Sequence, residues 1–331
     1  MPVLRIETGN KNNTFYDVTS KMYDIFTKEQ FDTDIVIEKE FEPLMSELYK
    51  KHGQECNVSY CSSNIDTITL KRSDNVIVGF SGGLDSAYLA LRLRDIGYNV
   101  TLMHLKGLNK SYPKEDVFAE RFAREAEFDY VELQVRHVSK QFFIDNPLKN
   151  QLILSLMLDY GIENDISNFA LGADWCTKLD DSKIGMTITD SIEVNNLYWD
   201  AITKYIENAE LVFIDDSTKK YERLKYILDN HAECLNNIYS CISPNRFNQH
   251  LHNNNEKKFG IDLLDGRCGS CYKCCMEIIL LTLLEFYDED SGLIDHCWKI
   301  MSDSKNSHRK DLFDKKIPIE QRIKNLMNYG S

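Results

Sequence analysis

The sequence predicts an α/β protein built on a doubly wound parallel sheet, with a small N-terminal α/β extension and a C-terminal helical region that binds zinc. Short apolar segments rich in β-branched residues alternate with helical segments through the middle of the chain. A turn with two glycines follows the first of these segments, and cysteines gather between residues 268 and 274. We expect three regions, at residues 1–72, 73–235 and 236–331.

Composition sets the broad class. Of the 331 residues, 43% are hydrophobic and 27% charged, which is ordinary for a globular chain with a sizeable core. A net charge of −13 provides no general basic surface, so we expect a small-molecule or protein substrate and no nucleic acid. No apolar run could span a bilayer, and Met1–Arg5 do not open a signal peptide. We therefore expect a cytoplasmic protein whose ten cysteines are thiols or metal ligands.

The first 72 residues do not follow the later alternation. Thr33–Lys39 is predicted to be a strand and Phe41–Lys51 a helix, which together favour a small α/β lobe. Cys56 and Cys61 have a spacing typical of structural thiols and not of a metal knuckle.

The first core strand is predicted at residues 76–80, where four apolar residues suit a strand covered on both faces. Gly82 and Gly83 allow the backbone to approach a ligand closely. Asp85 and Ser86 then stand at the start of an apolar helix. Backbone N–H groups at such a turn can bind phosphate oxygens, the serine adds a hydroxyl, and the aspartate can hold Mg²⁺.

The alternation continues to about residue 229. Further strands are predicted at Asn99–Leu105, Tyr130–Val135, Ile166–Leu171 and Ala209–Ile214. Helices are predicted at Lys114–Glu127, Asn150–Tyr160, Glu193–Ile206 and Thr218–Asp229. In a sheet of this kind, ligands lie beyond the carboxyl ends of the strands, where Ser81–Ser86, Met103–Lys106 and Gly172–Asp174 would meet.

The C-terminal part is predicted to be mainly helical. Residues 245–258, with three consecutive asparagines, are predicted to form a mobile loop. Residues 276–331 are predicted to be helical, beginning with the apolar run Met276–Tyr287.

A cysteine cluster is the second chemical feature. Cys268, Cys271 and Cys274 are separated by two residues each, and Cys241 lies upstream across the predicted loop. Two-residue spacing lets thiolates converge on one cation, so these four residues predict a closed tetrahedral Zn²⁺ site. Cys234 is an alternative to Cys241 as the fourth ligand.

Other interpretations of the cysteines stay open. An iron–sulfur cluster would need a spaced fourth cysteine before proline, whereas Cys275 directly follows Cys274. Unligated thiols are the third interpretation. Cys275 is the spare residue of the cluster, and Cys176 and Cys297 are expected to be buried thiols.

The order Ser81-Gly82-Gly83-Leu84-Asp85-Ser86 resembles the PP-loop of the ATP pyrophosphatase superfamily, which has the adenine nucleotide alpha hydrolase-like fold. Members split ATP into AMP and pyrophosphate while they activate a carbonyl or thiocarbonyl oxygen as an adenylate. No Gly-Lys-Ser/Thr follows, so the segment is not a Walker loop. A strand-to-helix turn that binds nothing is the alternative.

A PP-loop followed by a late Cys-Gly-x-Cys-x-x-Cys cluster is similar to the 7-cyano-7-deazaguanine synthase family (the QueC-like branch) over residues 74–290. That resemblance implies ATP-dependent activation of 7-carboxy-7-deazaguanine and reaction with ammonia. Phe80–Ser86, Leu171–Asp174, Thr218-Lys219 and Ser240-Cys241 match local pieces of the family pattern, and the last favours Cys241 over Cys234. Diverged relatives with an extra N-terminal region act in antiphage defence, so a defence-operon partner or a homodimer is expected.

The chain also departs from that pattern. Met103–Gly107 stands where the family has Asp-Tyr-Gly-Gln, and Lys149-Asn150 where it has Arg-Asn. For its Tyr-Pro-Asp-Cys-Arg substrate segment, Ile188–Ser191 is the nearest placement. ATP use is therefore better supported than the deazaguanine substrate.

The resemblance assigns roles to individual residues. The nucleotide-binding set is Phe80, Ser81, Gly82, Gly83, Leu84, Asp85, Ser86 and Met103. Asp85 is also expected to act in catalysis with Mg²⁺, and Lys219 to stabilise the pyrophosphate, although a surface lysine is an equal alternative. His104 is expected to be a hydrogen-bonded structural histidine, with proton transfer as the alternative.

Two other classes of function stay open. A tRNA-thiolating PP-loop enzyme would need a catalytic cysteine, for which Cys176 is the candidate, and the acidic balance speaks against tRNA. A non-catalytic nucleotide-binding subunit of a defence complex would keep the fold without turnover. The intact Asp85 and Ser86 favour an enzyme.

Overall fold

The structure, a computed structural model, falls into two compact units. It describes residues 4–7, 14–27, 36–51, 55, 58–62, 65–106, 114–134, 148–172, 192–212, 218–241, 245–260, 262–287, 292–303 and 316–328. Unit 1 consists of residues 1–80, 92–108 and 129–216, and unit 2 of residues 81–91, 109–128 and 217–331.

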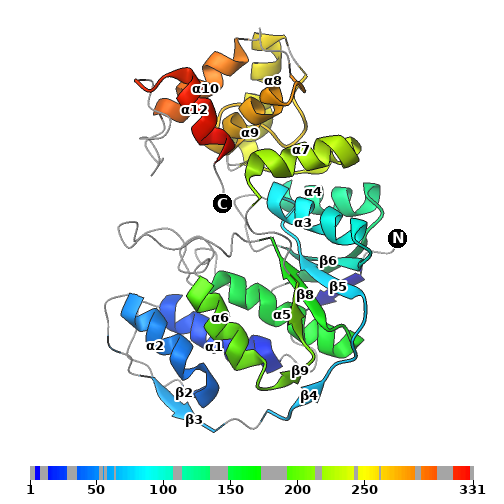
Figure 1. Ribbon diagram of the computed structural model, residues 1–331, viewed down its shortest axis with the longest axis vertical. Coiled ribbons are helices and arrows are strands. Elements are labelled where there is room, and N and C mark those ends of the chain that lie inside the picture. The colour runs from blue at the N-terminus through cyan, green and yellow to red at the C-terminus, as the bar shows by residue number, and fades with distance from the viewer. Residues whose placement is uncertain are drawn as a thin grey trace. The chain divides into compact units, whose positions relative to one another are not determined.

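The main sheet of unit 1 has six strands, all parallel, in the order β1-β7-β6-β5-β8-β10 (Figure 1). The strands are Leu4–Glu7 (β1), Asn75–Gly79 (β5), Asn99–Lys106 (β6), Asp129–Gln134 (β7), Asn168–Leu171 (β8) and Glu210–Leu211 (β10). The predicted parallel α/β sheet is confirmed. β5 lies between β6 and β8, and its residues Val76, Ile77 and Val78 are fully buried, as expected for a strand covered on both faces.

The chain reverses its direction of travel across the sheet at β5. β6 and β7 follow on one side of β5, whereas β8 and β10 lie on the other. The carboxyl end of the strand at such a reversal is where α/β proteins of this kind bind ligands. The glycine turn directly follows this strand in the chain.

Four helices of unit 1 share its hydrophobic core with the sheet, and Figure 1 shows them gathered together. They are Thr14–Thr27 (α1), Glu42–Lys51 (α2), Lys149–Asn164 (α5) and Ile192–Ile202 (α6). α1 packs on α5, and α2 on α6. The carboxylate of Asp159 on α5 accepts the backbone N–H groups of Phe15 at 3.0 Å and Tyr16 at 2.9 Å. Although these bonds favour the charged form, burial raises the pKa of Asp159 to about 7.

The N-terminal region contributes to the main sheet. β1 runs parallel to β7 with Leu4 opposite Val131, a pairing that the sequence did not indicate. The predicted strand and helix of this region are confirmed as Val36–Glu38 (β2) and α2, with the short 3₁₀ turn Lys39–Phe41 (η1) between them. β2 pairs with Ser59–Cys61 (β3), and Ile68–Thr69 (β4) pairs with Ile206–Glu207 (β9).

Helices make up most of the described part of unit 2. They are Lys114–Glu125 (α4), Lys220–His231 (α7), Asn245–Phe259 (α8), Tyr272–Leu283 (α9), Leu293–Asp303 (α10) and Ile319–Met327 (α12), with the 3₁₀ segment Ala232–Asn237 (η3). Helix α3 (Leu84–Asp95) begins in this unit. The predicted helical C-terminal region is confirmed, and residues 274–282 of α9 are all buried.

The predicted mobile loop at residues 245–258 is wrong, because this segment forms α8. Asparagine has a weak helix propensity, but tertiary contacts stabilise the helix. Asn255 Nδ2 donates to Cys268 O and to Ser270 Oγ, each at 2.8 Å, and His252 Nδ1 donates to Arg267 O at 2.7 Å.

The helix predicted to end at Ile206 is also too long. α6 ends at Ile202, and Ile206–Glu207 form β9, whose pairing with β4 is a contact across more than a hundred residues that local propensity does not encode.

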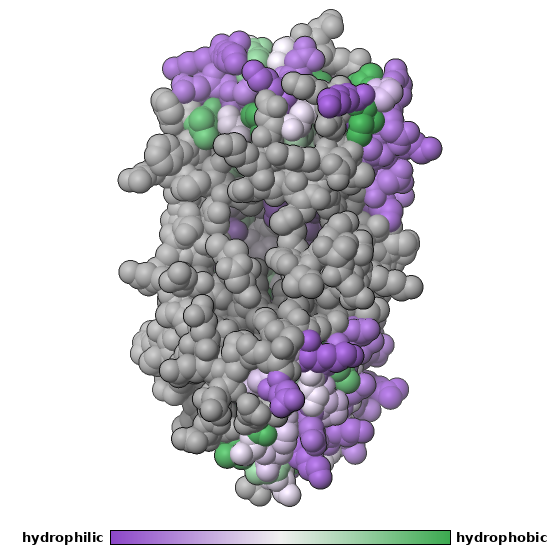
Figure 2. Space-filling view, turned by 90° about the vertical axis from the view of Figure 1, so that its left-hand side faces the viewer, coloured by the Kyte–Doolittle hydropathy of each residue, from purple (hydrophilic) through white to green (hydrophobic). Residues whose placement is uncertain are grey.

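Few large apolar side chains of the described residues are exposed. Among the coloured residues of the face in Figure 2, hydrophilic side chains outweigh hydrophobic ones. The exposed large apolar residues are Val36, Ile96, Val117, Phe286 and Ile319, which are scattered along the chain. Among the helices that the structure describes, none combines the length and apolar character needed to cross a membrane.

Candidate functional site

The glycine turn connects β5 to α3. Phe80, the residue after β5, is buried and its backbone N–H donates to Met103 O on β6 at 2.8 Å. This bond continues the ladder of the sheet one residue beyond β5. The helix starts at Leu84, which is buried, with Asp85 in its first turn. The predicted strand–turn–helix is thus confirmed.

Gly82 is required at its position. Its φ of +78° lies in the left-handed region, and a Cβ there would stand 3.3 Å from the backbone nitrogen of Ala119 on α4. A larger residue would strain the turn and press on α4. The neighbour that the structure shows at this glycine is α4; the predicted close approach to a ligand stays a prediction.

Two serines close the turn. Ser81 Oγ and Ser86 Oγ lie 3.2 Å apart, and the N–H of Gly83 donates to Ser81 Oγ at 3.3 Å. Ser86 Oγ also donates to Gly83 O at 3.1 Å and is buried, whereas Ser81 is exposed. The turn therefore places two hydroxyl groups beside the N-terminus of α3, where the helix dipole favours an anion.

Asp85 is held by two cations from α7. Lys220 Nζ donates to both carboxylate oxygens at 3.2 and 3.1 Å, and Arg223 Nη1 donates to Oδ1 at 2.6 Å. Burial alone would raise the pKa of Asp85, but these two charges and their hydrogen bonds lower it to about 2. Two cationic side chains thus lie beside the N-terminus of α3. The arrangement suits a polyanion.

Lys219 is placed differently from its neighbour. It is the N-cap residue of α7, and its backbone N–H donates to Glu222 Oε2 at 2.7 Å. The residues that contact Asp85 are instead Lys220 and Arg223, which sequence reasoning missed. Their i, i+3 spacing puts them on one helix face, but Lys219 lies i, i+4 from Arg223, so spacing alone could not have selected Lys220.

His104 is a buried, hydrogen-bonded residue of unit 1. Its Nδ1 donates to Phe80 O at 2.9 Å, and its ring stacks on Tyr130 at 6.3 Å between centroids. The structural role expected for His104 is therefore consistent with its contacts. Next along β6, Lys106 Nζ donates to both carboxylate oxygens of the buried Glu132 at 3.1 and 3.0 Å.

The four predicted cysteines come together in unit 2. The Sγ atoms of Cys241, Cys268, Cys271 and Cys274 all lie within 4.8 Å of one another. Those of Cys241 and Cys271 are 3.9 Å apart. Tetrahedral Zn²⁺ with Zn–S bonds of about 2.3 Å requires Sγ atoms about 3.8 Å apart, so the donor set fits this ion. A metal there would supply a cross-link between two segments of the chain.

The hydrogen bonds of the cluster divide its four thiols into two kinds. The backbone N–H of Cys268 donates to Cys274 Sγ at 3.3 Å, and that of Ser270 to Cys268 Sγ at 3.4 Å. Hydrogen bonding from Cys241 lowers the pKa of Cys268 and of Cys271, whereas hydrogen bonding with Cys268 raises the pKa of Cys241 and burial raises that of Cys274. Cys268 and Cys271 are thus the thiols most ready to bind a cation as thiolates.

The remaining described cysteines lie outside this group. Cys234 is buried on η3 and contacts Glu233 Oε1 at 3.8 Å, so the structure places Cys241 and not Cys234 with the other three. Cys275 and Cys297 are buried thiols, as predicted for Cys297. Cys61 is an exposed thiol of β3.

A buried arginine supports the turn that carries Cys268. Arg267 is fully buried, and its Nε donates to Glu277 Oε2 on α9 at 3.1 Å. Its Nη1 donates to Leu235 O at 3.2 Å. The guanidinium therefore connects η3, the cysteine turn and α9.

Several predictions fall outside the described residues. These are Cys56, Val135, Ala173, Asp174, Cys176 and Ile188–Ser191, and the side chain of Lys149.

Two comparisons with known proteins give matches. A family model for the tRNA methyl transferase HUP domain matches residues 74–162. The "predicted subunit of tRNA methyltransferase" from Methanocaldococcus jannaschii has a solved structure that is 19% identical, covers 48% of this chain and 89% of its own, and has a TM-score of 0.25. A TM-score this low does not establish a shared overall fold. No curated protein matches. Residues 74–162 are thus similar to a HUP domain of the PP-loop, or adenine nucleotide alpha hydrolase, superfamily, and neither match points to the deazaguanine synthase family.

Proposed function

We propose that the protein is an ATP-dependent ligase that adenylates a carboxylate, releases pyrophosphate and transfers the activated acid to ammonia or an amine. The contacts of Asp85 carry this proposal. The carboxylate lies in the first turn of α3, beside the glycine turn, and two cations of α7 approach it. A phosphate-binding turn with a carboxylate beside it suits a nucleoside triphosphate whose Mg²⁺ ion the carboxylate can bind.

ATP, when bound, would supply the adenylyl group and pyrophosphate as the leaving group. The amide of Gly83 and the hydroxyls of Ser81 and Ser86 would bind phosphate oxygens at the N-terminus of α3. Lys220 and Arg223 would neutralise the charge that develops on the leaving group, a role in which positive charge in a partly buried site is effective. This assignment replaces Lys219 by its neighbour.

Asp85 would hold Mg²⁺. In the structure its oxygens contact Lys220 and Arg223, and its side chain is 29% exposed. A metal must therefore compete with two cations for this carboxylate. The phosphates would relieve this competition because they offer both cations a new partner. We expect weak Mg²⁺ binding without nucleotide and strong binding with it.

The acid would be 7-carboxy-7-deazaguanine or a related heterocycle, and the amine ammonia or a protein group. The order of the PP-loop and the four-cysteine cluster supports this choice. A related modification in antiphage defence would use the same chemistry. The acidic net charge of −13 supports a small-molecule or protein substrate.

A tRNA-modifying PP-loop enzyme is the second candidate, because the family model that matches residues 74–162 represents the HUP domain of a tRNA methyl transferase. Such an enzyme would use the same nucleotide site and activate an oxygen of a base. It would need a basic surface to bind the RNA.

Pyrophosphate release separates these functions. The purified protein is incubated with ATP and Mg²⁺, alone, with 7-carboxy-7-deazaguanine and an ammonium salt, or with bulk tRNA. Release that depends on the acid supports the ligase, and release that depends on tRNA supports the second candidate. No release under any condition contradicts both and leaves a nucleotide-binding subunit.

A further inference from the structure

We propose that Tyr239 and Phe118 are positioning residues that connect the cysteine cluster to the glycine turn, so that metal bound at the cluster orders the nucleotide site. The inference rests on the proposed function where it concerns nucleotide. All of the contacts that carry it lie within unit 2.

The first connection is a backbone hydrogen bond. The N–H of Tyr239, two residues before Cys241, donates to Gly82 O at 2.7 Å. Because a peptide group is planar, fixing the carbonyl of Gly82 also fixes the direction of the N–H of Gly83. This amide belongs to the proposed phosphate site. A contact next to a metal ligand thus sets the orientation of a phosphate donor.

The second connection is aromatic. The ring of Phe118 on α4 lies 5.2 Å from that of Tyr239. Both belong to a buried hydrophobic cluster with Cys241, Cys268 and Cys274. Interiors are close-packed, so a shift of the cysteines would displace these rings.

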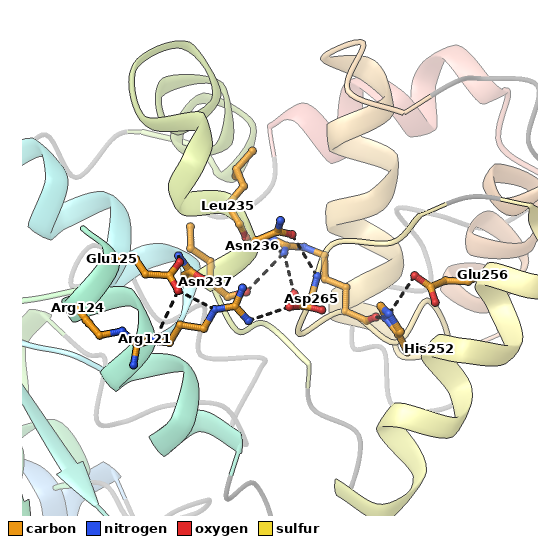
Figure 3. Close-up of polar contacts among 11 residues, drawn as sticks. Arg121, Arg124, Glu125, Leu235, Asn236, Asn237, His252, Glu256 and Asp265 are labelled. Carbon is orange, nitrogen blue, oxygen red and sulfur yellow. Dashed lines mark hydrogen bonds and ion pairs between the residues drawn. The ribbon is translucent and has the colours of Figure 1, made fainter. Parts of the chain in front are cut away.

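The third connection consists of polar contacts of α4, drawn in Figure 3. Arg121 Nη1 donates to Asp265 Oδ2 at 2.8 Å, and Asn237 Nδ2 donates to Glu125 Oε2 at 2.6 Å (Figure 3). Asp265 lies three residues before Cys268. α4 itself touches the turn, since its residue 119 limits the space at Gly82. Helix α4 therefore provides a second route between the cysteine turn and the glycine turn, in addition to the backbone contact of Tyr239.

A metal would change the stiffness of this arrangement. With a bound ion, four thiolates are cross-linked, and the segments of Cys241 and Cys268 are fixed relative to each other. Without the ion, this cross-link between the two segments is absent. The turn would then lose the fixed position of Tyr239. Because coupling between two sites is reciprocal, nucleotide must in turn raise the affinity for metal.

The first test needs no nucleotide. Amide hydrogen exchange of the full chain is measured for residues 79–88, with Zn²⁺ and after chelation, and for residues 149–164 as the control segment in unit 1. We expect removal of the metal to speed exchange in 79–88 by about tenfold or more and to leave 149–164 unchanged. Unchanged exchange in 79–88 overturns the proposal.

Variants show that the effect passes through Tyr239. Tyr239→Pro removes both the donating N–H and the ring, whereas Tyr239→Phe keeps both. With cobalt in the cluster, we expect both variants to keep the absorption of tetrahedral thiolate-bound Co²⁺, and only Tyr239→Pro to show fast exchange in 79–88. Slow exchange in a loaded Tyr239→Pro protein overturns the proposal. If this variant does not fold, the wild-type comparison decides alone.

The second test measures the coupling itself. Co²⁺ affinity is determined by competition with a chelator, with and without α,β-methylene-ATP and Mg²⁺. We expect nucleotide to raise Co²⁺ affinity about five- to a hundredfold in wild type and in Tyr239→Phe, and not in Tyr239→Pro. Binding of the analogue without a shift in wild type overturns the coupling. Failure of the analogue to bind at all contradicts the proposed function instead, and the exchange experiment still decides the positioning role.

Discussion

The glycine turn and the cysteine cluster differ in the kind of ion that their side chains can bind. At the turn, two cationic side chains, Lys220 and Arg223, contact Asp85 in the first turn of α3. In the cluster, four buried or half-buried cysteines bring their Sγ atoms together as a donor set for a cation. One centre is suited to an anion and the other to a cation. The two centres nevertheless lie in one unit, and the short segment of residues 237–241 contacts both: Tyr239 contacts the glycine turn, and Cys241 belongs to the cysteine cluster.

The largest effect is expected from loss of a metal ligand. Cys241→Ser should lose the metal and destabilise unit 2, because structural Zn²⁺ contributes on the order of 10 kcal/mol of apparent binding free energy in small zinc domains. Metal content and the thermal unfolding midpoint are the measurements. Cys234→Ser is the matched control, since this thiol is also buried but lies outside the cluster. Metal loss in Cys234→Ser and retention in Cys241→Ser would reverse the assignment.

Asp85→Asn addresses the other centre. The amide cannot hold Mg²⁺ as a carboxylate does, so pyrophosphate release should fall by about 10³-fold or more while the metal content at the cysteines stays the same. Asp95→Asn, an exposed residue at the end of the same helix, is the control. Release that persists in Asp85→Asn would mean that the glycine turn is not the reacting site.

The next effect distinguishes two adjacent lysines. Lys220→Met removes a cation that contacts Asp85, and we expect nucleotide affinity to fall about ten- to a hundredfold, as for loss of a hydrogen bond to a charged group. Lys219→Met should change affinity little, because Lys219 is the N-cap residue of α7 and its backbone N–H, which donates to Glu222, is kept in the variant. Calorimetric titration with α,β-methylene-ATP measures both. The opposite order would restore the role that the sequence suggested for Lys219.

The smallest effect concerns stability and pH in unit 1, away from both centres. Because the pKa of Asp159 is raised from 3.8 to about 7, the native state keeps a proton that the unfolded chain releases between these values. The free energy of unfolding therefore falls as pH rises from about 4 to about 7, by at most about 1.4 kcal/mol per pH unit, and this contribution is constant above pH 7.

Asp159→Asn should remove that slope. The difference in unfolding free energy between the variant and wild type, from denaturant titrations at pH 5 and pH 8, should shift in favour of the variant at the higher pH. Asp74→Asn, at an exposed position, serves as the control and should show no such shift. A pH-independent difference for Asp159→Asn would contradict the raised pKa.

Local patterns account for what could be predicted. The strand, turn and helix at residues 75–95 are contiguous, and two-residue spacing identified Cys268, Cys271 and Cys274, whereas the choice of Cys241 over Cys234 rested on the family resemblance. These features depend on residues that are close together in the sequence. The alternation of strands and helices likewise predicted the parallel sheet.

What could not be predicted depends on contacts between distant residues. The pairing of Asp85 with Lys220 and Arg223 spans about 135 positions, and nothing local distinguishes Lys220 from Lys219. α8 is stabilised by its contacts with the cysteine turn, whereas its asparagines alone favour a loop. β1 has only four residues and becomes a strand by pairing with β7.

We propose that the turn after β5 binds a nucleoside triphosphate. The most direct test is calorimetric titration of wild type, Gly82→Ala and Gly97→Ala with α,β-methylene-ATP and Mg²⁺. Both glycines have positive φ, but a Cβ at Gly82 meets α4 whereas one at Gly97 meets nothing within 4 Å. The account predicts one site in wild type, similar affinity in Gly97→Ala, and a loss of about tenfold or more in Gly82→Ala. Equal affinity in all three proteins, or no binding to wild type, would contradict it.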